Sequence, residues 1–151
     1  MIDFIIYTDG GSRGNPGEAA LGFVIKDGSE RILKEHGERL GITTNNVAEY
    51  KASIAALKKL KSMIGSKRAK DSKIEVRTDS ELLERQVNAK YKVKEKELIP
   101  LFIEIWNLRQ DFGSVSFVHV SRTNNRGADY MVNEALDARG DQESFGGLLT
   151  Q

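Results

Sequence analysis

Short apolar runs and turn signals alternate along the first 40 residues of the chain. The run 3–9 is mostly apolar and is typical of a buried strand, whereas 10–17 is rich in Gly, Asn and Pro and predicts a turn. Two further strands are expected over 19–27 and 30–40, because an Asp-Gly pair between them is a strong hairpin signal. The chain is therefore expected to open with a three-stranded antiparallel meander.

Apolar residues then recur at helical spacing. From 47 to 64 they follow the pattern of an amphipathic helix, and Thr44 is a candidate N-cap. The remaining elements are expected as a polar linker over 65–72, a strand over 74–79, a short helix over 80–87, a helix over 98–108, a strand over 115–120 and a final helix from about Gly127. We predict an α/β fold of order βββαβααβα, with a five-stranded mixed sheet in which two parallel strands join the meander, flanked by helices.

Composition and charge change this picture little. At 151 residues the chain is most simply one domain, and its net charge is only +1, so attraction to nucleic acid must come from local basic clusters. Cysteine is absent, which excludes disulfides and thiolate-bound zinc. No apolar stretch approaches the roughly 20 residues of a membrane span, and we expect a cytoplasmic protein that does not contact membranes.

Four acidic residues stand where an ordinary surface charge is hard to explain. Asp9 and Asp79 each end a strand-like run, Glu49 lies at the edge of a helical apolar stripe, and Asp129 falls in the first turn of the last helix. Strand ends in an open α/β sheet line the crevice where ligands bind, and converging carboxylates repel each other unless a metal neutralises them. We predict a Mg²⁺ site. Taken singly, each residue is more readily explained as a turn former, a cap or a surface charge, but four such coincidences at one edge of one sheet are not.

Four segments, in a fixed order, resemble one enzyme family. They are 7–17 (YTDGGSRGNPG), 44–49 (TNNVAE), 78–80 (TDS) and 124–129 (NNRGAD), and together they span nearly the whole domain. In these segments the chain resembles type 1 ribonuclease H, in its compact form without a hybrid-binding domain or basic protrusion. This family cuts the RNA strand of RNA–DNA hybrids. The resemblance implies the ribonuclease H-like fold, with a catalytic domain over 1–140. The C-terminal tail over 141–151 carries Phe145, Leu148 and Leu149 among glycines, and we expect it to dock on this domain.

The resemblance also implies a mechanism that uses two Mg²⁺ ions, with Mn²⁺ able to substitute. Asp9 would bridge both ions, Glu49 and Asp79 would hold the ion near the leaving 3′ oxygen, and Asp129 would complete the site of the water-activating ion. Two cations roughly 3.5–4 Å apart supply both a nucleophile and stabilisation of the leaving oxygen. The expected products carry a 5′-phosphate and a 3′-hydroxyl.

Further residues are expected to contact the hybrid, because A-like geometry is recognised through 2′-hydroxyls and the backbone. By resemblance, Asn15 and Asn45 read the minor groove from either side of the site, and Thr44 holds a DNA phosphate. Asn15 also suits a plain turn, and Thr44 and Asn45 suit plain helix caps. The loop that brings backbone amides to the RNA strand contains Gly10, Gly11 and Ser12.

Departures from the family leave three assignments open. Glu81 stands where many relatives carry a neutral amide, so it either binds a 2′-hydroxyl or faces water. Lys92 and Lys94 belong to a basic stretch that either grips phosphates or forms a solvated face. The loop before the last helix lacks the histidine that many members carry, and Arg122 or Asn124 is the candidate replacement.

We therefore expect a monomeric endonuclease that hydrolyses the RNA strand of RNA–DNA hybrids, without an obligate protein partner. Activity on double-stranded RNA stays open. One alternative is a module on the same fold that binds hybrids or double-stranded RNA without cutting. Another is a resolvase or exonuclease that shares the fold.

Overall fold

A five-stranded mixed sheet forms the centre of the computed structural model, which describes the backbone of residues 1–149 and the side chains of residues 1–138. The sheet order is β3-β2-β1-β4-β5, with β1, β2 and β3 antiparallel and β1, β4 and β5 parallel. This confirms the predicted sheet. The strands are β1 (Phe4–Gly14), β2 (Gly17–Asp27), β3 (Ile32–Thr43), β4 (Lys73–Thr78) and β5 (Ser114–His119).

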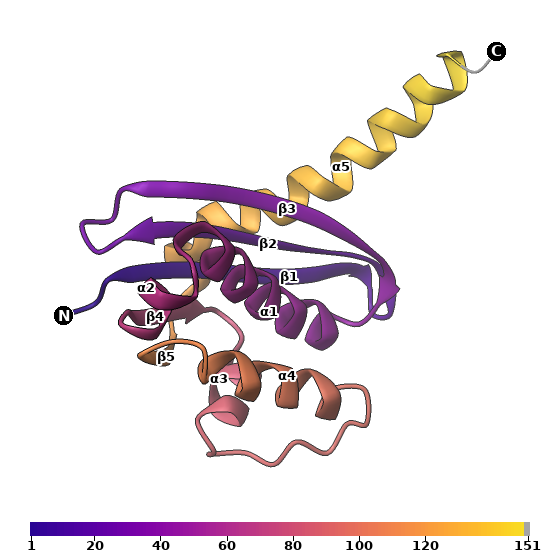
Figure 1. Cartoon of the computed structure of the whole chain (residues 1–151). Helices are drawn as coiled ribbons and strands as arrows, with labels where there is room; N and C mark the ends of the chain where they lie inside the picture. Colours follow the sequence, from indigo (N-terminus) through magenta and orange to yellow (C-terminus); the bar gives the residue numbers. More distant parts are fainter. Residues whose placement is uncertain (150–151) are drawn as a thin grey trace.

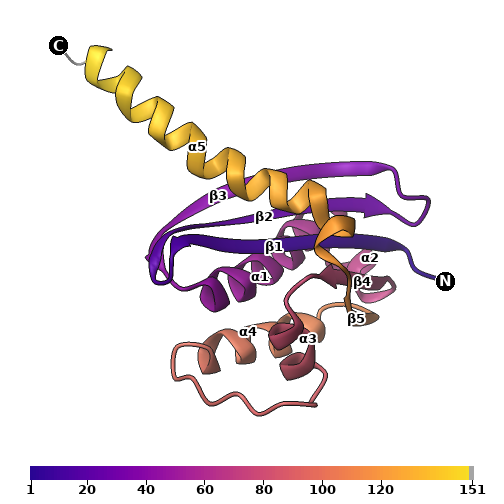
Figure 2. The same cartoon turned by 180° about the vertical axis from the view of Figure 1, so that it is seen from behind.

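Helices cover both faces of the sheet (Figures 1 and 2). On one face α1 packs against β1 and β2, and α4 packs against α1; on the other face α5 crosses β1, β2 and β3. The helices are α1 (Asn45–Ile64), α2 (Ser66–Lys70), α3 (Glu81–Val87), α4 (Ile99–Arg109) and α5 (Arg126–Leu149), with a 3₁₀ turn, η1 (Arg122–Asn125), directly before α5. Among the described residues, no helix has the length and apolarity needed to cross a membrane.

The main core lies between α1, α4 and the sheet. The apolar positions predicted for the first helix are buried from Val47 to Leu60, and they pack on strand residues such as Phe23 and Val76. A small second cluster, of Ala20, Val132 and Leu136, lies under α5. The sheet is therefore held on both faces, by a large core on one side and a narrow contact on the other.

The predicted turn over 10–17 is confined to residues 15 and 16, because β1 continues to Gly14 and pairs with β2 along its whole length. Glycine adopts extended backbone readily, and the cross-strand hydrogen bonds satisfy the segment without a loop. Asp9 therefore lies within a long strand and not at its tip. The parallel neighbour β4 ends at Thr78, which lies opposite Thr8. On that side Asp9 has no strand residue opposite it, because β4 has already ended.

Two short helices were not predicted. The expected linker over 65–72 contains α2, whose end is held by a 2.6 Å hydrogen bond from Ser72 Oγ to the Arg68 carbonyl oxygen. The loop before the last helix contains η1, where Ser121 Oγ accepts a hydrogen bond from Asn124 N at 3.3 Å. The proposed docking of the tail over 141–151 concerns side chains outside the described residues, and it stays a prediction.

Candidate active site

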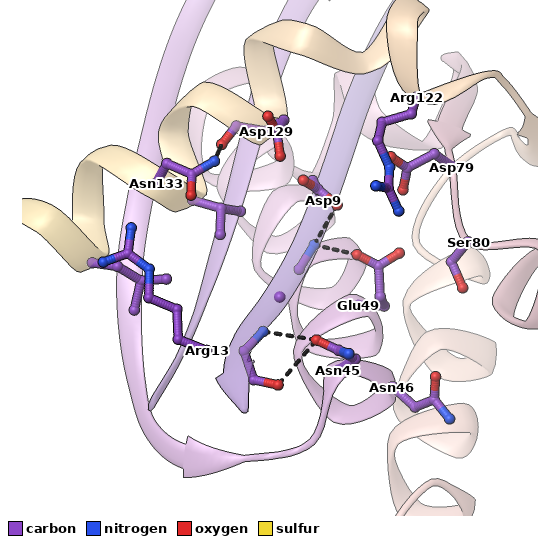
Figure 3. Close-up of a pocket in the computed structure, with 15 residues that line it drawn as sticks. Asp9, Arg13, Asn45, Asn46, Glu49, Asp79, Ser80, Arg122, Asp129 and Asn133 are labelled. Atoms are coloured by element: carbon purple, nitrogen blue, oxygen red, sulfur yellow. Dashed lines mark hydrogen bonds between the residues drawn. The ribbon is translucent and has the colours of Figure 1, made fainter. Parts of the chain in front are cut away.

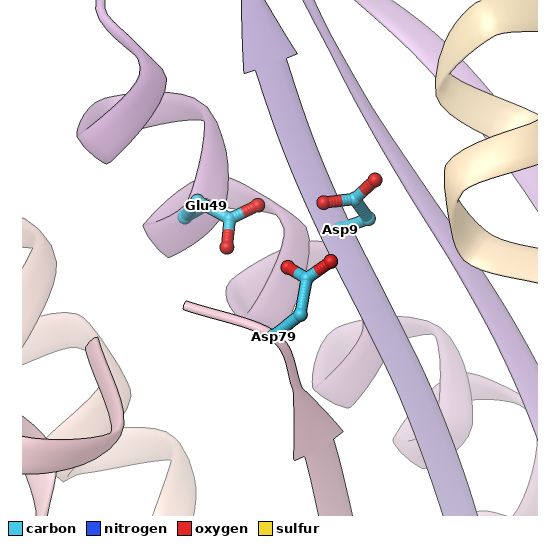
Figure 4. Close-up of side chains that lie close together, drawn as sticks. All are labelled: Asp9, Glu49 and Asp79. Carbon is cyan, nitrogen blue, oxygen red and sulfur yellow. The ribbon is translucent and has the colours of Figure 1, made fainter. Parts of the chain in front are cut away.

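Three carboxylates meet on the α1 face of the sheet (Figure 4). Asp9 comes from β1, Glu49 from the first turns of α1, and Asp79 from the residue after β4. One oxygen of each carboxylate lies within 4.8 Å of the others. Asp9 and Glu49 are each only 8% exposed, so this acidic group lies in a partly buried position. The predicted convergence of these three residues is therefore observed.

Gly10 allows β1 and α1 to approach closely at this point. A Cβ atom on Gly10 would lie 2.2 Å from the carbonyl carbon of Ala48 and 2.4 Å from Glu49 N. Its backbone N–H donates to Glu49 Oε1 and, over 3.0 Å, to Asp9 Oδ1. The glycine is thus needed for the position of Glu49, and one amide orients two carboxylates.

Asp129 lies in the first turn of α5 and borders the same pocket, although it is not within the group of three (Figure 3). The negative charge of Asp129 adds to the rise in the pKa of Asp9. The helix approaches the sheet over two glycines: a Cβ on Gly22 would lie 2.5 Å from the Ala128 carbonyl oxygen, and one on Gly37 would lie 2.3 Å from that of Met131. These contacts bring Asp129 to the opposite side of Asp9 from Glu49.

Burial and mutual repulsion make the carboxylates hard to ionise together. Burial and the neighbouring charge of Asp79 raise the pKa of Asp9 to about 7. Burial, followed by the charge of Asp9, also raises the pKa of Glu49 well above its usual value. Among the described side chains, none of the four acidic residues forms an ion pair with Lys or Arg. An all-oxygen donor set with unbalanced negative charge fits a hard divalent cation.

The carboxylates line an open pocket of about 370 Å³ between α1 and α5. Of the residues predicted to bind substrate, this pocket contains Gly10, Gly11, Ser12 and Asn45, and it also contains Arg122. Its other lining residues are Arg13, Asn46, Ser80, Val132, Asn133 and Leu136. The lining residues extend from Asn45 at the start of α1 to Leu136 in the third turn of α5 (Figure 3).

Asn15 and Asn45 lie next to each other. Asn15 Oδ1 accepts a hydrogen bond from Asn45 N at 3.1 Å, and Asn45 Oδ1 accepts from Ser12 N at 2.7 Å and from Ser12 Oγ at 3.0 Å. The Ser12 backbone N–H can only donate, so the atom of the Asn45 amide that faces it must be the oxygen. The Asn45 Nδ2 group is therefore on the other side of the amide and is available for a ligand. The turn between β1 and β2 thus brings Asn15 next to Asn45 at the start of α1, and their contact with the minor groove from either side of the site stays a prediction.

Several other predicted contacts lie outside the pocket. Glu81 is exposed and pairs with Arg85 at 2.8 Å, while Lys92 and Lys94 are exposed on the segment between α3 and α4. Thr44 caps α1 by accepting from Val47 N at 3.2 Å, which confirms its capping role.

The two candidates for the missing histidine are separated by the structure. Asn124 borders a second hollow with Tyr7 and Arg126, whereas Arg122 lines the pocket that contains the carboxylates. The turn η1 causes this difference, since successive residues of a tight helical turn face different directions. Only Arg122 therefore lies where a group acting at the carboxylates would have to lie.

Two pocket residues were missed although the sequence contained a signal for each. Asn133 stands four residues after Asp129, the spacing of one helical face, and its Nδ2 donates to the Asp129 carbonyl oxygen at 3.1 Å. Arg13 follows Asp9 by four residues on one strand face, and it forms a 2.7 Å ion pair with Asp137 of α5. The turn expected over 10–17 concealed the second pattern.

Comparisons with known proteins agree with this geometry. Residues 7–135 match a family model described as reverse transcriptase-like. A ribonuclease HI of Halobacterium salinarum is 40% identical over 134 residues, which make up 87% of this chain and 63% of that protein. A bifunctional protein of Mycobacterium tuberculosis is 36% identical over 135 residues, or 89% of this chain and 35% of the relative. The chain thus spans less than two thirds of these relatives.

A solved structure shares the fold over nearly its full length. LC11-RNase H1, isolated from compost and crystallised in complex with an RNA/DNA hybrid, superposes with a TM-score of 0.86 at 47% identity. The match covers 90% of this chain and 98% of that one. This agreement in sequence and fold shows that the chain belongs to the type 1 ribonuclease H family.

Proposed function

We propose that this protein is an endonuclease that hydrolyses the RNA strand of RNA–DNA hybrids with two divalent metal ions, Mg²⁺ or in its place Mn²⁺. The observation that carries the proposal is the group formed by Asp9, Glu49 and Asp79, with oxygens within 4.8 Å of one another and Asp129 beside them. The hybrid bound by LC11-RNase H1 supports the choice of substrate. The products would carry a 5′-phosphate and a 3′-hydroxyl.

The four carboxylates would divide between the two ions. Asp9 lies between the other acidic residues and would contribute to both positions, with Glu49 and Asp79 on one side and Asp129 on the other (Figure 3). When bound, the ions would lower the pKa of an attacking water and stabilise charge on the leaving oxygen. The hydrogen bonds from Gly10 hold Asp9 and Glu49 in place before any ion arrives, so little reorganisation is needed.

Backbone and amide donors next to the carboxylates would bind the RNA strand. Asn45 Nδ2 is directed away from its Ser12 partners and can donate to a 2′-hydroxyl or a base edge in the minor groove. Gly11 brings the backbone close to the ligand, and the Thr44 hydroxyl, which accepts from the helix, still has a proton to donate to a phosphate. A monomeric state and a cytoplasmic location complete the proposal.

A panel of nucleic acids tests the function. The wild-type protein with Mg²⁺ should cut the RNA of an RNA–DNA hybrid and leave duplex DNA and a four-way junction intact, and a chelator should abolish cleavage. Cutting of the junction in preference to the hybrid would assign a resolvase, and binding without any cleavage would assign a binding module. Cleavage of double-stranded RNA in the same panel would extend the substrate range.

The variant Asp79→Asn tests the role of the acidic group. It should abolish cleavage while hybrid binding and folding persist, because it removes one ligand and also relieves repulsion on Asp9. Asp71→Asn is the matched control, since it makes the same change at an exposed residue outside the pocket. Substantial cleavage by Asp79→Asn would contradict the proposed catalytic site.

A further inference from the structure

The segment between α3 and α4, residues 88–98, has no regular secondary structure but is anchored at both ends. At its start, the backbone N–H groups of Lys90 and Tyr91 donate to the Arg85 carbonyl oxygen at 2.8 and 3.1 Å. At its end, Leu98 is fully buried at 0% exposure in the main core. This basic segment, as we call residues 88–98, is therefore a fixed loop between two helices.

A buried hydrogen-bond chain holds the middle of the basic segment. Tyr50 Oη donates to Gln86 Oε1 at 2.6 Å, and Gln86 Nε2 donates to the Lys92 carbonyl oxygen at 3.1 Å. Tyr50 is 1% exposed and Gln86 is 4% exposed. The direction of the chain is unambiguous, because a carbonyl oxygen can only accept and because burial raises the pKa of Tyr50 to about 12.

This chain connects the basic segment to the acidic site. Tyr50 follows Glu49 in α1, so one turn of helix supplies both a carboxylate to the pocket and a hydroxyl to the chain. Gln86 lies on α3, which begins two residues after Asp79 and is capped by Ser80 through a 3.2 Å hydrogen bond from Leu83 N. The position of Lys92 is thus set by the same two helices that position Glu49 and Asp79.

The outer face of the basic segment carries four lysines and the two glutamates Glu95 and Glu97, and Lys90 pairs with Glu84 at 3.9 Å. Lys92, Lys94 and Lys96 are exposed, and within the described part of the chain none of them forms an ion pair. Val93 packs partly buried against the core between two of them, so the alternation directs the lysines outward. Unpaired lysines on a fixed backbone are suited to a polyanion, because little conformational entropy is lost on binding.

We propose that Gln86 is a positioning residue for nucleic-acid binding, which through the Lys92 carbonyl fixes the basic segment so that Lys92 and Lys94 contact phosphates of a duplex engaged at the carboxylates. The inference rests on the proposed function for the identity of the duplex, an RNA–DNA hybrid. Gln86 does not touch substrate. It acts by holding the backbone that carries the two lysines.

The test compares two variants. Gln86→Met removes the hydrogen bond from Tyr50 and the one to the Lys92 carbonyl oxygen, whereas Tyr50→Phe removes only the Tyr50–Gln86 bond. Hybrid affinity is measured in chelator across a salt series, and kcat and KM are measured with Mg²⁺. Gln86→Met should raise Kd and KM about fivefold or more and leave kcat unchanged. The slope of log Kd against log salt concentration should fall by about 1 to 2, because one or two phosphate contacts are lost. Tyr50→Phe should change Kd less than about twofold, although it loses a buried hydrogen bond of similar energy.

A mutant cycle separates positioning from general stability. Lys92→Ala with Lys94→Ala should weaken binding as Gln86→Met does, and adding Gln86→Met to that pair should cause little further loss, since both act through the same contacts. If Gln86→Met does not fold, Gln86→Leu replaces it, because leucine likewise can neither accept from Tyr50 nor donate to Lys92.

Two results would overturn the inference. The first is a salt dependence of Kd in Gln86→Met, or in its substitute, that equals that of the wild-type protein. The second is a triple variant whose loss of binding free energy equals the sum of the losses in Gln86→Met and in the double lysine variant. The readout in chelator does not depend on cleavage. A wild-type protein that binds hybrids but never cuts them would therefore refute the proposed function while still testing the role of Gln86.

Discussion

Asn125 Nδ2 donates a hydrogen bond to the carbonyl oxygen of Thr8 over 2.8 Å, and both residues are buried, at 0% and 1% exposure. The bond joins the turn before α5 to the strand residue that precedes Asp9. Asn125 Oδ1 is also buried and has no hydrogen-bond partner. A half-satisfied amide in a core lowers stability, so the residue is explained by the position it gives to α5 and hence to Asp129.

Replacing Asn125 by Leu should therefore impair cleavage more than folding. The Thr8 carbonyl oxygen loses its side-chain donor, and we expect a loss of about 1–2 kcal/mol in the free energy of unfolding. Cleavage should fall at least about tenfold as Asp129 moves from Asp9, by comparison with the effect of misplaced catalytic groups. Urea unfolding and cleavage rates measure the two effects. Asn124→Leu, at an exposed neighbouring position, should leave both nearly unchanged.

Adding one methyl group to Gly10 should disrupt the acidic site. In Gly10→Ala the new Cβ would lie 2.2 Å from the Ala48 carbonyl carbon, so β1 and α1 must separate and Glu49 must move. The expected cost is about 1–3 kcal/mol, as for overpacked cores, together with loss of cleavage. Gly11→Ala is the control for stability alone, because its nearest neighbour is Val132 Cγ1 at 3.7 Å, an ordinary contact. An equal loss of unfolding free energy in the two variants would refute this account of Gly10.

The position of α5 can be changed without touching the group of three carboxylates. In Gly22→Ala the added Cβ would lie 2.5 Å from the Ala128 carbonyl oxygen, which is backbone and cannot rotate away. We expect α5 to shift, Mn²⁺ binding at the Asp129 side to weaken, and stability to fall by about 1–3 kcal/mol. Calorimetric titration with Mn²⁺ measures this. Retention of two equally strong binding events in the variant would contradict the role assigned to Asp129.

The raised pKa of Asp9 predicts a stability that depends on pH. Since this pKa rises from 3.8 to about 7 on folding, the group favours the folded state most strongly below pH 3.8, and this contribution is lost as the pH rises through about 7. In chelator, the free energy of unfolding should therefore fall between pH 6 and pH 8, on the order of 1–2 kcal/mol. Asp9→Asn should flatten this dependence. A profile unchanged by Asp9→Asn would refute the assignment.

Divalent ions should reverse that loss. Mg²⁺ at about 100 times its Kd adds about 2.7 kcal/mol to the free energy of unfolding. The gain should be larger at pH 8 than at pH 6, because protons compete with the ion for the Asp9 carboxyl group. Thermal unfolding with and without Mg²⁺ at the two pH values measures this. An equal gain at both, in the wild-type protein and in Asp9→Asn, would place the ion elsewhere.

The periodicity of the chain was sufficient to predict most elements, because strand and helix periods are local properties. The apolar stripe of α1 and the Thr44 cap follow from residues close together in sequence, and the parallel arrangement of β1, β4 and β5 follows from the helical connections between them. The motifs around Asp9, Glu49 and Asp79 likewise identified the acidic site. The convergence of Asp9, Glu49 and Asp79 follows from the rule that crossovers between parallel strands are right-handed. This rule places β1 and β4 side by side, next to the start of α1.

Contacts across the sheet decided what the sequence alone left open or misassigned. The segment 10–14 is strand because β2 supplies its hydrogen-bond partners, and Gly10 and Gly22 are required by helices from distant parts of the chain. The choice between Arg122 and Asn124 depended on a 3₁₀ turn, and the link from Gln86 to Lys92 depended on α3 packing against α1. Such features come from which backbones approach in space, and a local pattern does not encode that distance.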